Sequence, residues 1–222
     1  MPTWIERLGT KYPDLSPCLP DVEQAYTVLH QAFASGHKLL VCGNGGSAAD
    51  SEHIVGELMK GFYSKRPLPP HVREALMAGD PEAGRVLAER LQGALPAISL
   101  VSQTALITAF ANDVDPDLVF AQQVYGYGQP GDVLMGISTS GNSRNVLYAL
   151  HTARALGMRT IGVTGLTGGQ MPSIPDVTIR VPETRTADIQ ERHLAIYHAL
   201  CAQLEEDLFP EGVIVQMHNQ GS

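Results

Sequence analysis

Cysteines and long apolar runs are scarce in this sequence, and each scarcity excludes a class of protein. The three cysteines (Cys18, Cys42 and Cys201) are odd in number, widely spaced and without a CxxC pair. This pattern argues against a disulfide framework and predicts reduced, mostly buried thiols. No apolar run approaches the length of a membrane span, and residues 1–7 lack the basic-then-apolar order of a signal peptide. We therefore expect a cytoplasmic protein with no membrane partner.

Positive charge is also scarce. Lys and Arg together number 15 against 23 Asp and Glu, which gives a formal net charge of -8. Nucleic acids and anionic membranes are bound by basic faces, so neither is expected as a partner. A phosphorylated small molecule held by local dipoles remains possible. The 222 residues, 44% hydrophobic and 17% charged, suffice for one globular domain with its own core.

What the chain does contain is a recurring strand–turn–helix pattern. Continuous apolar strands that alternate with helices are typical of a parallel sheet covered on both faces. We therefore predict an α/β fold, with a doubly wound, five-stranded parallel sheet flanked by helices. The strands are expected at residues 38–42, 97–101, 133–137, 160–164 and 177–181, and the main helices at 22–34, 48–60, 145–156 and 187–208.

Two segments fall outside this pattern. Residues 68–95 contain Pro69, Pro70 and a Gly79-Asp80-Pro81 break, which indicates an insertion of one or two helices within a single domain at residues 1–210. Residues 211–222 form a polar tail with a short apolar run at 213–215, and this tail is predicted to be flexible.

The most informative stretch is the hydroxyl-rich loop Ser138-Thr139-Ser140-Gly141-Asn142-Ser143, between an expected strand and an expected helix. Free backbone N–H groups and the dipole at a helix start favour an anion, and the hydroxyls add neutral donors. A simple helix cap is the alternative for one Ser or Thr. Four hydroxyls in six residues favour a phosphate site.

The turn Gly43-Asn44-Gly45-Gly46-Ser47 follows the first strand and lies at the same sheet edge, where ligands of such sheets bind. It has neither the GxGxxG spacing of a dinucleotide site nor the GK[ST] of a P-loop. A tight structural turn explains it about as well as a ligand site does.

Titratable residues recur at helical spacing in two of the expected helices. His53 and Glu57 are four residues apart and share a helix face, where they could bind a divalent metal such as Zn²⁺. A surface ion pair or a core histidine is the alternative, and spacing alone favours it. In the last helix, Gln190 could pair with His193 as readily as with His198.

Asn112 and Asp113 follow an apolar run at what reads as a helix end. Helix capping is the plain interpretation. An alternative role is to bind substrate hydroxyl groups, since amide and carboxylate groups suit polyols.

Taken in order, these motifs resemble those of sugar isomerase (SIS) domain proteins, and among them the phosphoheptose isomerase family (sedoheptulose-7-phosphate isomerases). The resemblance covers nearly the whole chain apart from the insertion and the tail. The segments that carry it are Gly43 to Ser47, His53-x-x-x-Glu57, Ala111-Asn112-Asp113, Gly131 to Leu134, Ser138 to Ser143, Ile189-Gln190-Glu191 and His198.

The resemblance implies a cytoplasmic homotetramer with active sites shared between subunits, and an aldose–ketose isomerase. Its substrate would be sedoheptulose 7-phosphate, converted to D-glycero-D-manno-heptose 7-phosphate through an enediol. It implies one Zn²⁺ per subunit, held by His53, Glu57, Gln190 and His198, and so selects His198 over His193. It also implies substrate contacts at Asn44, Gly45, Gly46, Ser47, Glu57, Asn112, Asp113, Ser138, Thr139, Ser140, Ser143 and Gln190. As a hypothesis, Glu57 is the catalytic base and His198 the catalytic acid.

Two other functions are compatible with the motifs. A non-catalytic SIS branch binds a replication-initiator protein, but its members do not keep the side chains that match Glu57 and His198. An isomerase acting on a different sugar phosphate is the other. The insertion at 68–95 departs from the usual family pattern and leaves the exact sugar open, because it follows the helix of His53 and could reach the mouth of a site or a subunit interface. A surface helical hairpin without such a role is the alternative.

Overall fold

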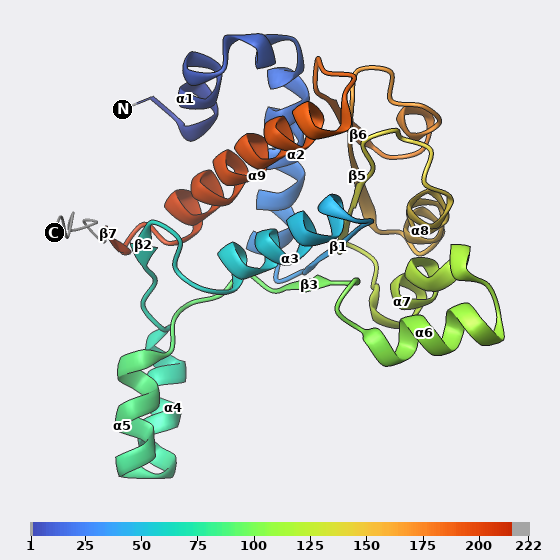
Figure 1. Cartoon of the computed structure of the whole chain (residues 1–222). Coiled ribbons are helices and arrows are strands. Elements are labelled where there is room, and N and C mark those ends of the chain that lie inside the picture. Colours follow the sequence, from blue (N-terminus) through green and yellow to red (C-terminus); the bar gives the residue numbers. More distant parts are fainter. Residues whose placement is uncertain (1, 215–222) are drawn as a thin grey trace, which may run out of the picture.

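A five-stranded parallel sheet forms the centre of the protein, in a computed structural model that describes residues 2–214 (Figure 1). The strands β1 (Leu39–Gly43), β3 (Ala97–Ser99), β4 (Val133–Ile137), β5 (Arg159–Thr164) and β6 (Val177–Arg180) lie in the order β3-β1-β4-β5-β6. The chain leaves β1 towards one edge and returns to its other side at β4, so the sheet is doubly wound. The predicted fold class is confirmed.

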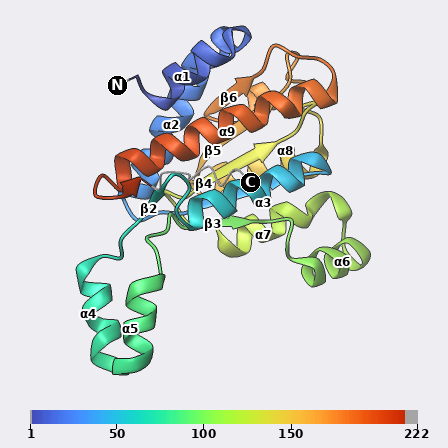
Figure 2. The same ribbon diagram turned by 60° about the vertical axis from the view of Figure 1, so that its left-hand side comes forward.

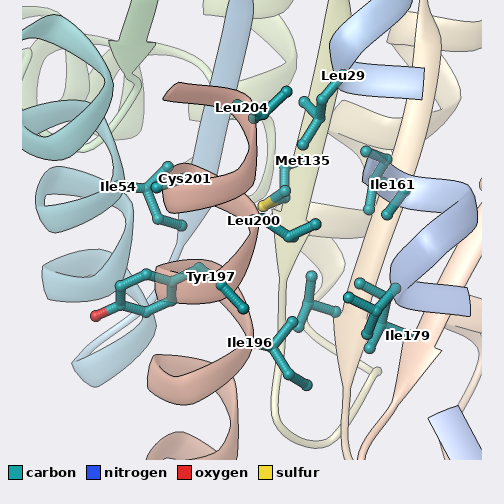
Figure 3. Close-up of a cluster of buried hydrophobic side chains, with 14 of the residues drawn as sticks. Leu29, Ile54, Met135, Ile161, Ile179, Ile196, Tyr197, Leu200, Cys201 and Leu204 are labelled. Atoms are coloured by element: carbon teal, nitrogen blue, oxygen red, sulfur yellow. The ribbon is translucent and has the colours of Figure 1, made fainter. Parts of the chain in front are cut away.

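Alternating strand residues build a core on each face of the sheet. Leu39 and Val41 point into the core beneath α2 (Leu19–Ala34), α3 (Gly46–Met59) and α9 (Thr186–Leu208), part of which Figure 3 shows. Leu40 and Cys42 point into the other core, beneath α7 (Val119–Tyr127) and α8 (Arg144–Ala155). The helix α1 (Trp4–Lys11) packs on α9 and α2. All three cysteines are buried and free, as predicted.

The insertion forms a helical hairpin that projects from the body of the protein (Figures 1 and 2). Its helices are α4 (Pro70–Gly79) and α5 (Pro81–Arg90), separated at Asp80, which caps α5 through the N–H of Ala83 at 2.8 Å. Gly84 is the one buried residue of the two helices, and a Cβ there would lie 2.3 Å from the Leu76 carbonyl oxygen. The prediction of one or two helices is confirmed as two.

Two short strands, β2 (Ser64–Lys65) and β7 (Val213–Ile214), form an antiparallel pair beside the base of the hairpin. Residues 213 and 214 of the tail predicted to be flexible lie in this strand, whereas residues 215–222 lie outside the described residues, so the flexibility of the tail stays a prediction. Within residues 2–214, no helix is both long and apolar enough to cross a membrane.

A buried ion pair that the sequence pattern did not predict ties the end of α3 to α9. Arg66 donates to a carboxylate oxygen of Glu205 at 2.7 Å, and both side chains are almost completely buried. Arg66 also donates to the carbonyls of Leu58 and Glu57, at 2.5 and 2.9 Å. The two oxygens of Glu205 accept in addition the backbone N–H groups of residues 62–64. This pair fixes the backbone that carries Glu57.

Candidate functional site

A cavity of about 290 Å³ lies at the carboxyl ends of β1 and β4, where the sheet changes its winding direction. The glycine turn after β1 and the hydroxyl loop after β4 both line it. The lining residues are Asn44, Gly45, Gly46, Ser47, Ile137, Ser138, Thr139, Ser143, Thr186 and Gln190. Eight of the predicted substrate contacts therefore lie together.

Three helices begin at this cavity. Gly46 is the first residue of α3, Ser143 precedes the first residue of α8, and Thr186 is the first residue of α9. Each helix start carries unpaired N–H groups and a partial positive charge. No Lys or Arg is among the lining residues that the structure describes. The cavity therefore offers an anion dipoles and neutral donors in place of a cation.

The hydroxyl loop has a compact internal structure. The hydroxyls of Ser138 and Ser143 lie 2.9 Å apart, and the N–H of Gly141 donates to the Ser138 carbonyl at 3.0 Å. Gly141 has a φ of +66°, and a Cβ there would lie 1.8 Å from the carbonyl oxygen of Gly168. Only glycine fits this position, because any side chain would be strained and would collide with backbone. The loop is therefore held in shape before a ligand arrives.

Asn145 does not line the cavity, but it holds Asn44, which does, and the sequence reasoning missed it. Its side-chain amide exchanges two hydrogen bonds of 2.9 Å with that of Asn44, so the turn after β1 is joined to the start of α8. The pairing spans 101 residues in sequence. In the sequence, only the position of Asn145 next to the hydroxyl loop could have indicated this role. Thr186, also missed, carried no signal beyond its place at the start of a predicted helix.

Gln190 packs directly on Gly46. A Cβ on Gly46 would lie 2.3 Å from Nε2 of Gln190, so the glycine allows α9 to place its amide in the cavity. This close approach gives the glycine turn a role that spacing alone did not reveal.

Glu57 and His198 both face His53, further along α3 and α9. A carboxylate oxygen of Glu57 lies 3.2 Å from Nε2 of His53, and Nε2 of His198 lies 3.5 Å from the same atom. Lys60 donates to the other carboxylate oxygen of Glu57 at 3.0 Å. Burial, followed by the neighbouring His53, lowers the pKa of His198 below its ordinary value, which favours its neutral imidazole.

Gln190 does not join these three side chains. It lies eight residues before His198, about 12 Å along the helix axis, and it contacts Gly46 instead. Among residues 2–214, no group of three or more His, Cys, Asp or Glu side chains is arranged to hold a metal as placed. The structure thus brings three of the four predicted metal ligands into pairwise contact through His53, and leaves the fourth in the cavity.

His193, the alternative partner of Gln190, is a core residue. It is buried, and Nε2 lies 3.3 Å from the carbonyl oxygen of Thr164, to which its N–H can donate. Burial lowers the pKa of this histidine to about 4. His193 therefore lies on the interior side of α9, whereas His198 faces α3.

We expect the buried His193 to make the protein less stable in mild acid. Between about pH 6.5 and 4 the unfolded chain binds a proton on this residue and the folded chain does not, so the free energy of unfolding falls as the pH falls. The full loss is about 3 kcal/mol, measurable by urea unfolding across this window. His193→Gln should reduce the slope because glutamine can still donate to Thr164 without titrating. Replacement of the exposed His71 by Gln should leave the slope of unfolding free energy against pH unchanged. If His193→Gln has the same slope as the wild type, the acid destabilisation does not come from His193.

Four predicted substrate residues do not line the cavity, and one of them, Glu57, lies beside His53. Asn112 and Asp113 lie at the exposed end of α6 (Thr104–Asp113), where the Asn112 amide donates to the Asp113 carboxylate at 2.8 Å. Ser140 accepts the N–H of Asn142 at 3.2 Å within the hydroxyl loop. The plain interpretation of Asn112 and Asp113 as helix-end residues fits their position within one chain.

A family model matches most of this chain. The model of the SIS domain matches residues 19–93 and 81–165. Among curated proteins, the phosphoheptose isomerase of Rhodospirillum rubrum is 40% identical over 194 residues, which cover 87% of this chain and 89% of that protein. The phosphoheptose isomerase of Alteromonas mediterranea is 41% identical over 211 residues, which cover 93% of each.

Solved structures agree with the sequence comparisons. The phosphoheptose isomerase of Neisseria gonorrhoeae is 34% identical with a TM-score of 0.71, and that of Francisella tularensis is 32% identical with a TM-score of 0.73. Each alignment covers 88% of this chain and 91% of the other. The similarity therefore extends over the fold and over the elements that build the cavity.

Proposed function

Because this chain belongs to the SIS domain family, and within it to the phosphoheptose isomerases, we propose that it interconverts sedoheptulose 7-phosphate and D-glycero-D-manno-heptose 7-phosphate. The observation that carries the proposal is the joint placement of two unlike sites on the same pair of helices. The cavity at the starts of α3 and α9, with its backbone N–H groups and hydroxyls, suits a phosphate. The Glu57, His198 and His53 side chains lie further along these helices.

The distance between the two sites matches a sugar phosphate. His53 lies seven residues beyond Gly46 on α3, or about 10 Å, and His198 lies about 12 Å beyond Gln190 on α9. An extended seven-carbon sugar with its phosphate is about 10 Å long at roughly 1.3 Å per bond. A phosphate in the cavity would therefore place the other end of the sugar near Glu57 and His198. Binding energy from the phosphate then orients the reacting carbons.

The isomerisation moves one proton between C1 and C2 through an enediol. In our proposal the Glu57 carboxylate removes the proton from one carbon and returns it to the other. His198, whose lowered pKa favours the neutral form, donates a hydrogen bond to the oxygen of the reacting carbonyl. It can pass its proton to that oxygen and recover one from the neighbouring hydroxyl as the new carbonyl forms, so that the ring ends neutral. Lys60 donates a hydrogen bond to the Glu57 carboxylate and holds it in position.

The donor atoms around His53 support a zinc ion as cofactor. The separations of 3.2 and 3.5 Å are close to the roughly 3.3–3.4 Å between ligands of a tetrahedral zinc with bonds of 2.0–2.1 Å. The ligands would be His53, Glu57 and His198, with Gln190 as the proposed fourth, one ion per subunit. Side-chain rotations, above all of Gln190, would be needed to bring all four ligands to one zinc ion. When bound, zinc would polarise the carbonyl and stabilise negative charge on the enediolate.

We further propose a cytoplasmic homotetramer with shared active sites. None of the ten residues of the apolar helix α6 is buried within the chain, so α6 is suited to contact a second copy. Asn112 and Asp113 lie at its exposed end and outside their own chain's cavity. A neighbouring cavity could receive them, where they would bind substrate hydroxyls.

The non-catalytic SIS branch is the second candidate. A protein that only binds a partner has no need of Glu57 and His198 placed against one imidazole nitrogen. That placement, together with the isomerase relatives, favours the enzyme.

Incubation of the purified protein with a panel of ketose phosphates of different lengths tests the proposal. We expect aldose formation with sedoheptulose 7-phosphate and much slower turnover of shorter sugars, detected by NMR of the anomeric protons. A chelator should abolish turnover, and added Zn²⁺ should restore it. Failure to turn over any member of the panel would contradict the isomerase function. Turnover that survives complete metal removal would contradict the cofactor alone.

A further inference from the structure

One side chain outside the predicted site, Tyr197, contacts His53 at the ring nitrogen that does not face Glu57, and a second, Asp50, contacts Tyr197. The hydroxyl of Tyr197 lies 2.9 Å from Nδ1 of His53 and 3.3 Å from a carboxylate oxygen of Asp50. Tyr197 is 4% exposed, and its ring packs edge-on against the imidazole with centroids 5.4 Å apart. In Figure 3 its hydroxyl points away from the sheet. The ring is therefore held by the core while its polar end contacts His53.

We propose that Asp50 and Tyr197 are positioning residues that hold the proton of neutral His53 on Nδ1 and leave Nε2 free to bind a cation. The tautomer follows from the hydrogen-bond donors and acceptors around Nδ1 of His53. The identity of the cation as Zn²⁺ rests on the proposed function.

A count of protons gives the direction of the hydrogen bonds. A phenol carries one proton, and an ionised carboxylate can only accept. Among the described residues, Tyr197 is the one hydrogen-bond donor to Asp50, whose other carboxylate oxygen is buried and without a partner. If Tyr197 instead donated to His53, both oxygens of this half-buried carboxylate would lack a donor, which is costly. Tyr197 therefore donates to Asp50 and accepts from Nδ1–H of His53.

This direction determines what the other imidazole nitrogen can do. With its proton on Nδ1, His53 presents a lone pair at Nε2 towards the Glu57 carboxylate at 3.2 Å and the His198 imidazole at 3.5 Å. An acceptor that faces a carboxylate is unfavourable unless a donor or a cation lies beside it. In the metal-free protein the N–H of His198 can donate to this lone pair, and a bound cation would replace that donor. A partner on the second nitrogen of a metal-binding histidine commonly fixes its tautomer and orientation. Asp50 and Tyr197 are suited to that role.

Nitrogen-15 NMR of the metal-free protein tests the tautomer directly. At about pH 9, above the ordinary imidazole pKa of about 6.5, we expect wild-type His53 to carry its proton on Nδ1, with the signal assigned by its loss in His53→Gln. Tyr197→Phe should remove this preference. Asp50→Ala should reverse it, because the Tyr197 proton is then free to go to Nδ1. A wild-type proton on Nε2, or a tautomer unaffected by both variants, would overturn the inference.

Zinc affinity, measured by competition with a chelator, gives a second readout. Tyr197→Phe should weaken binding about 10- to 100-fold, the range typical for partners of metal ligands. Tyr26→Phe is a matched control, since Tyr26 donates to Asp207 at 2.5 Å and has no contact with His53 among the described residues. Equal affinity in wild type and Tyr197→Phe would overturn the inference. An inactive wild type with the expected tautomer and affinity would count against the proposed function only.

Discussion

Glu57→Gln should lower the turnover of sedoheptulose 7-phosphate by about 100- to 10,000-fold, the contribution typical of a positioned general base. Glutamine keeps the size and the hydrogen-bonding oxygen of glutamate but cannot accept a proton from carbon. The Glu57 side chain is 14% exposed and makes contacts at its carboxylate with His53 and Lys60. The loss should therefore appear in kcat, while the phosphate cavity, which lies elsewhere, keeps KM within a few-fold.

Glu52→Gln provides a matched control on the same helix. Glu52 is exposed and accepts the hydroxyl of Ser102 at 2.7 Å, away from His53. We expect this variant to retain near-normal turnover. Circular dichroism and a zinc measurement on Glu57→Gln should accompany the assay, because a lost ligand and a lost base both reduce kcat. A correctly folded Glu57→Gln with near-normal turnover would rule out Glu57 as the base.

Arg66→Met should destabilise the protein by about 3–5 kcal/mol, the cost of leaving a buried charge without its partner. Methionine fills part of the space but donates nothing to Glu205, which is buried beneath it. The carbonyls of Glu57 and Leu58 at the end of α3 also lose their donor. We expect a matching fall in the urea midpoint, and a displaced α3 terminus that lowers activity as well.

The exposed Arg85 is a suitable control for this prediction. Its side chain is 60% exposed and lies 3.4 Å from Glu89 in the projecting hairpin, so Arg85→Met should change stability by less than about 0.5 kcal/mol. Removing Glu205 together with Arg66 should not restore stability fully, because the N–H groups of residues 62–64 would lose their acceptor. Unfolding should be measured at one protein concentration for all variants. An Arg66→Met protein as stable as Arg85→Met would show that the ion pair is dispensable.

Features that depend on neighbouring residues could be predicted from the sequence. The strands are continuous apolar runs, and the loops after β1 and β4 are recognisable by their glycines and hydroxyls, which lie at the same sheet edge. The spacing of His53 and Glu57 places them on one helix face, and the structure brings them within 3.2 Å. The observed helix boundaries differ from the predicted ones by up to three residues. One helix was predicted to begin at residue 22 but begins at Leu19. Its first turn contains Pro20, which a helix tolerates there but which is not part of the hydrophobic periodicity.

Contacts between distant segments could not be predicted in this way. The choice between His193 and His198 needed the rotation of α9 against the sheet, which buries one and turns the other to α3. The two residues of the Asn44–Asn145 pair are 101 residues apart, and those of the Arg66–Glu205 pair are 139 residues apart. The sequence around each of these four residues contains no pattern that indicates its partner.

The sequence by itself determined the α/β class, the order of strands and helices along the chain, and the loops suited to bind an anion. These features depend on hydrophobic periodicity and turn chemistry, which act over a few residues. It also carried the family resemblance. Only the tertiary structure decided that three helices begin at one cavity, that Gln190 packs on Gly46, and that the Tyr197 hydroxyl lies beside His53. The reason is physical: a side chain's partner depends on how elements pack, and packing optimises the whole core rather than any single segment.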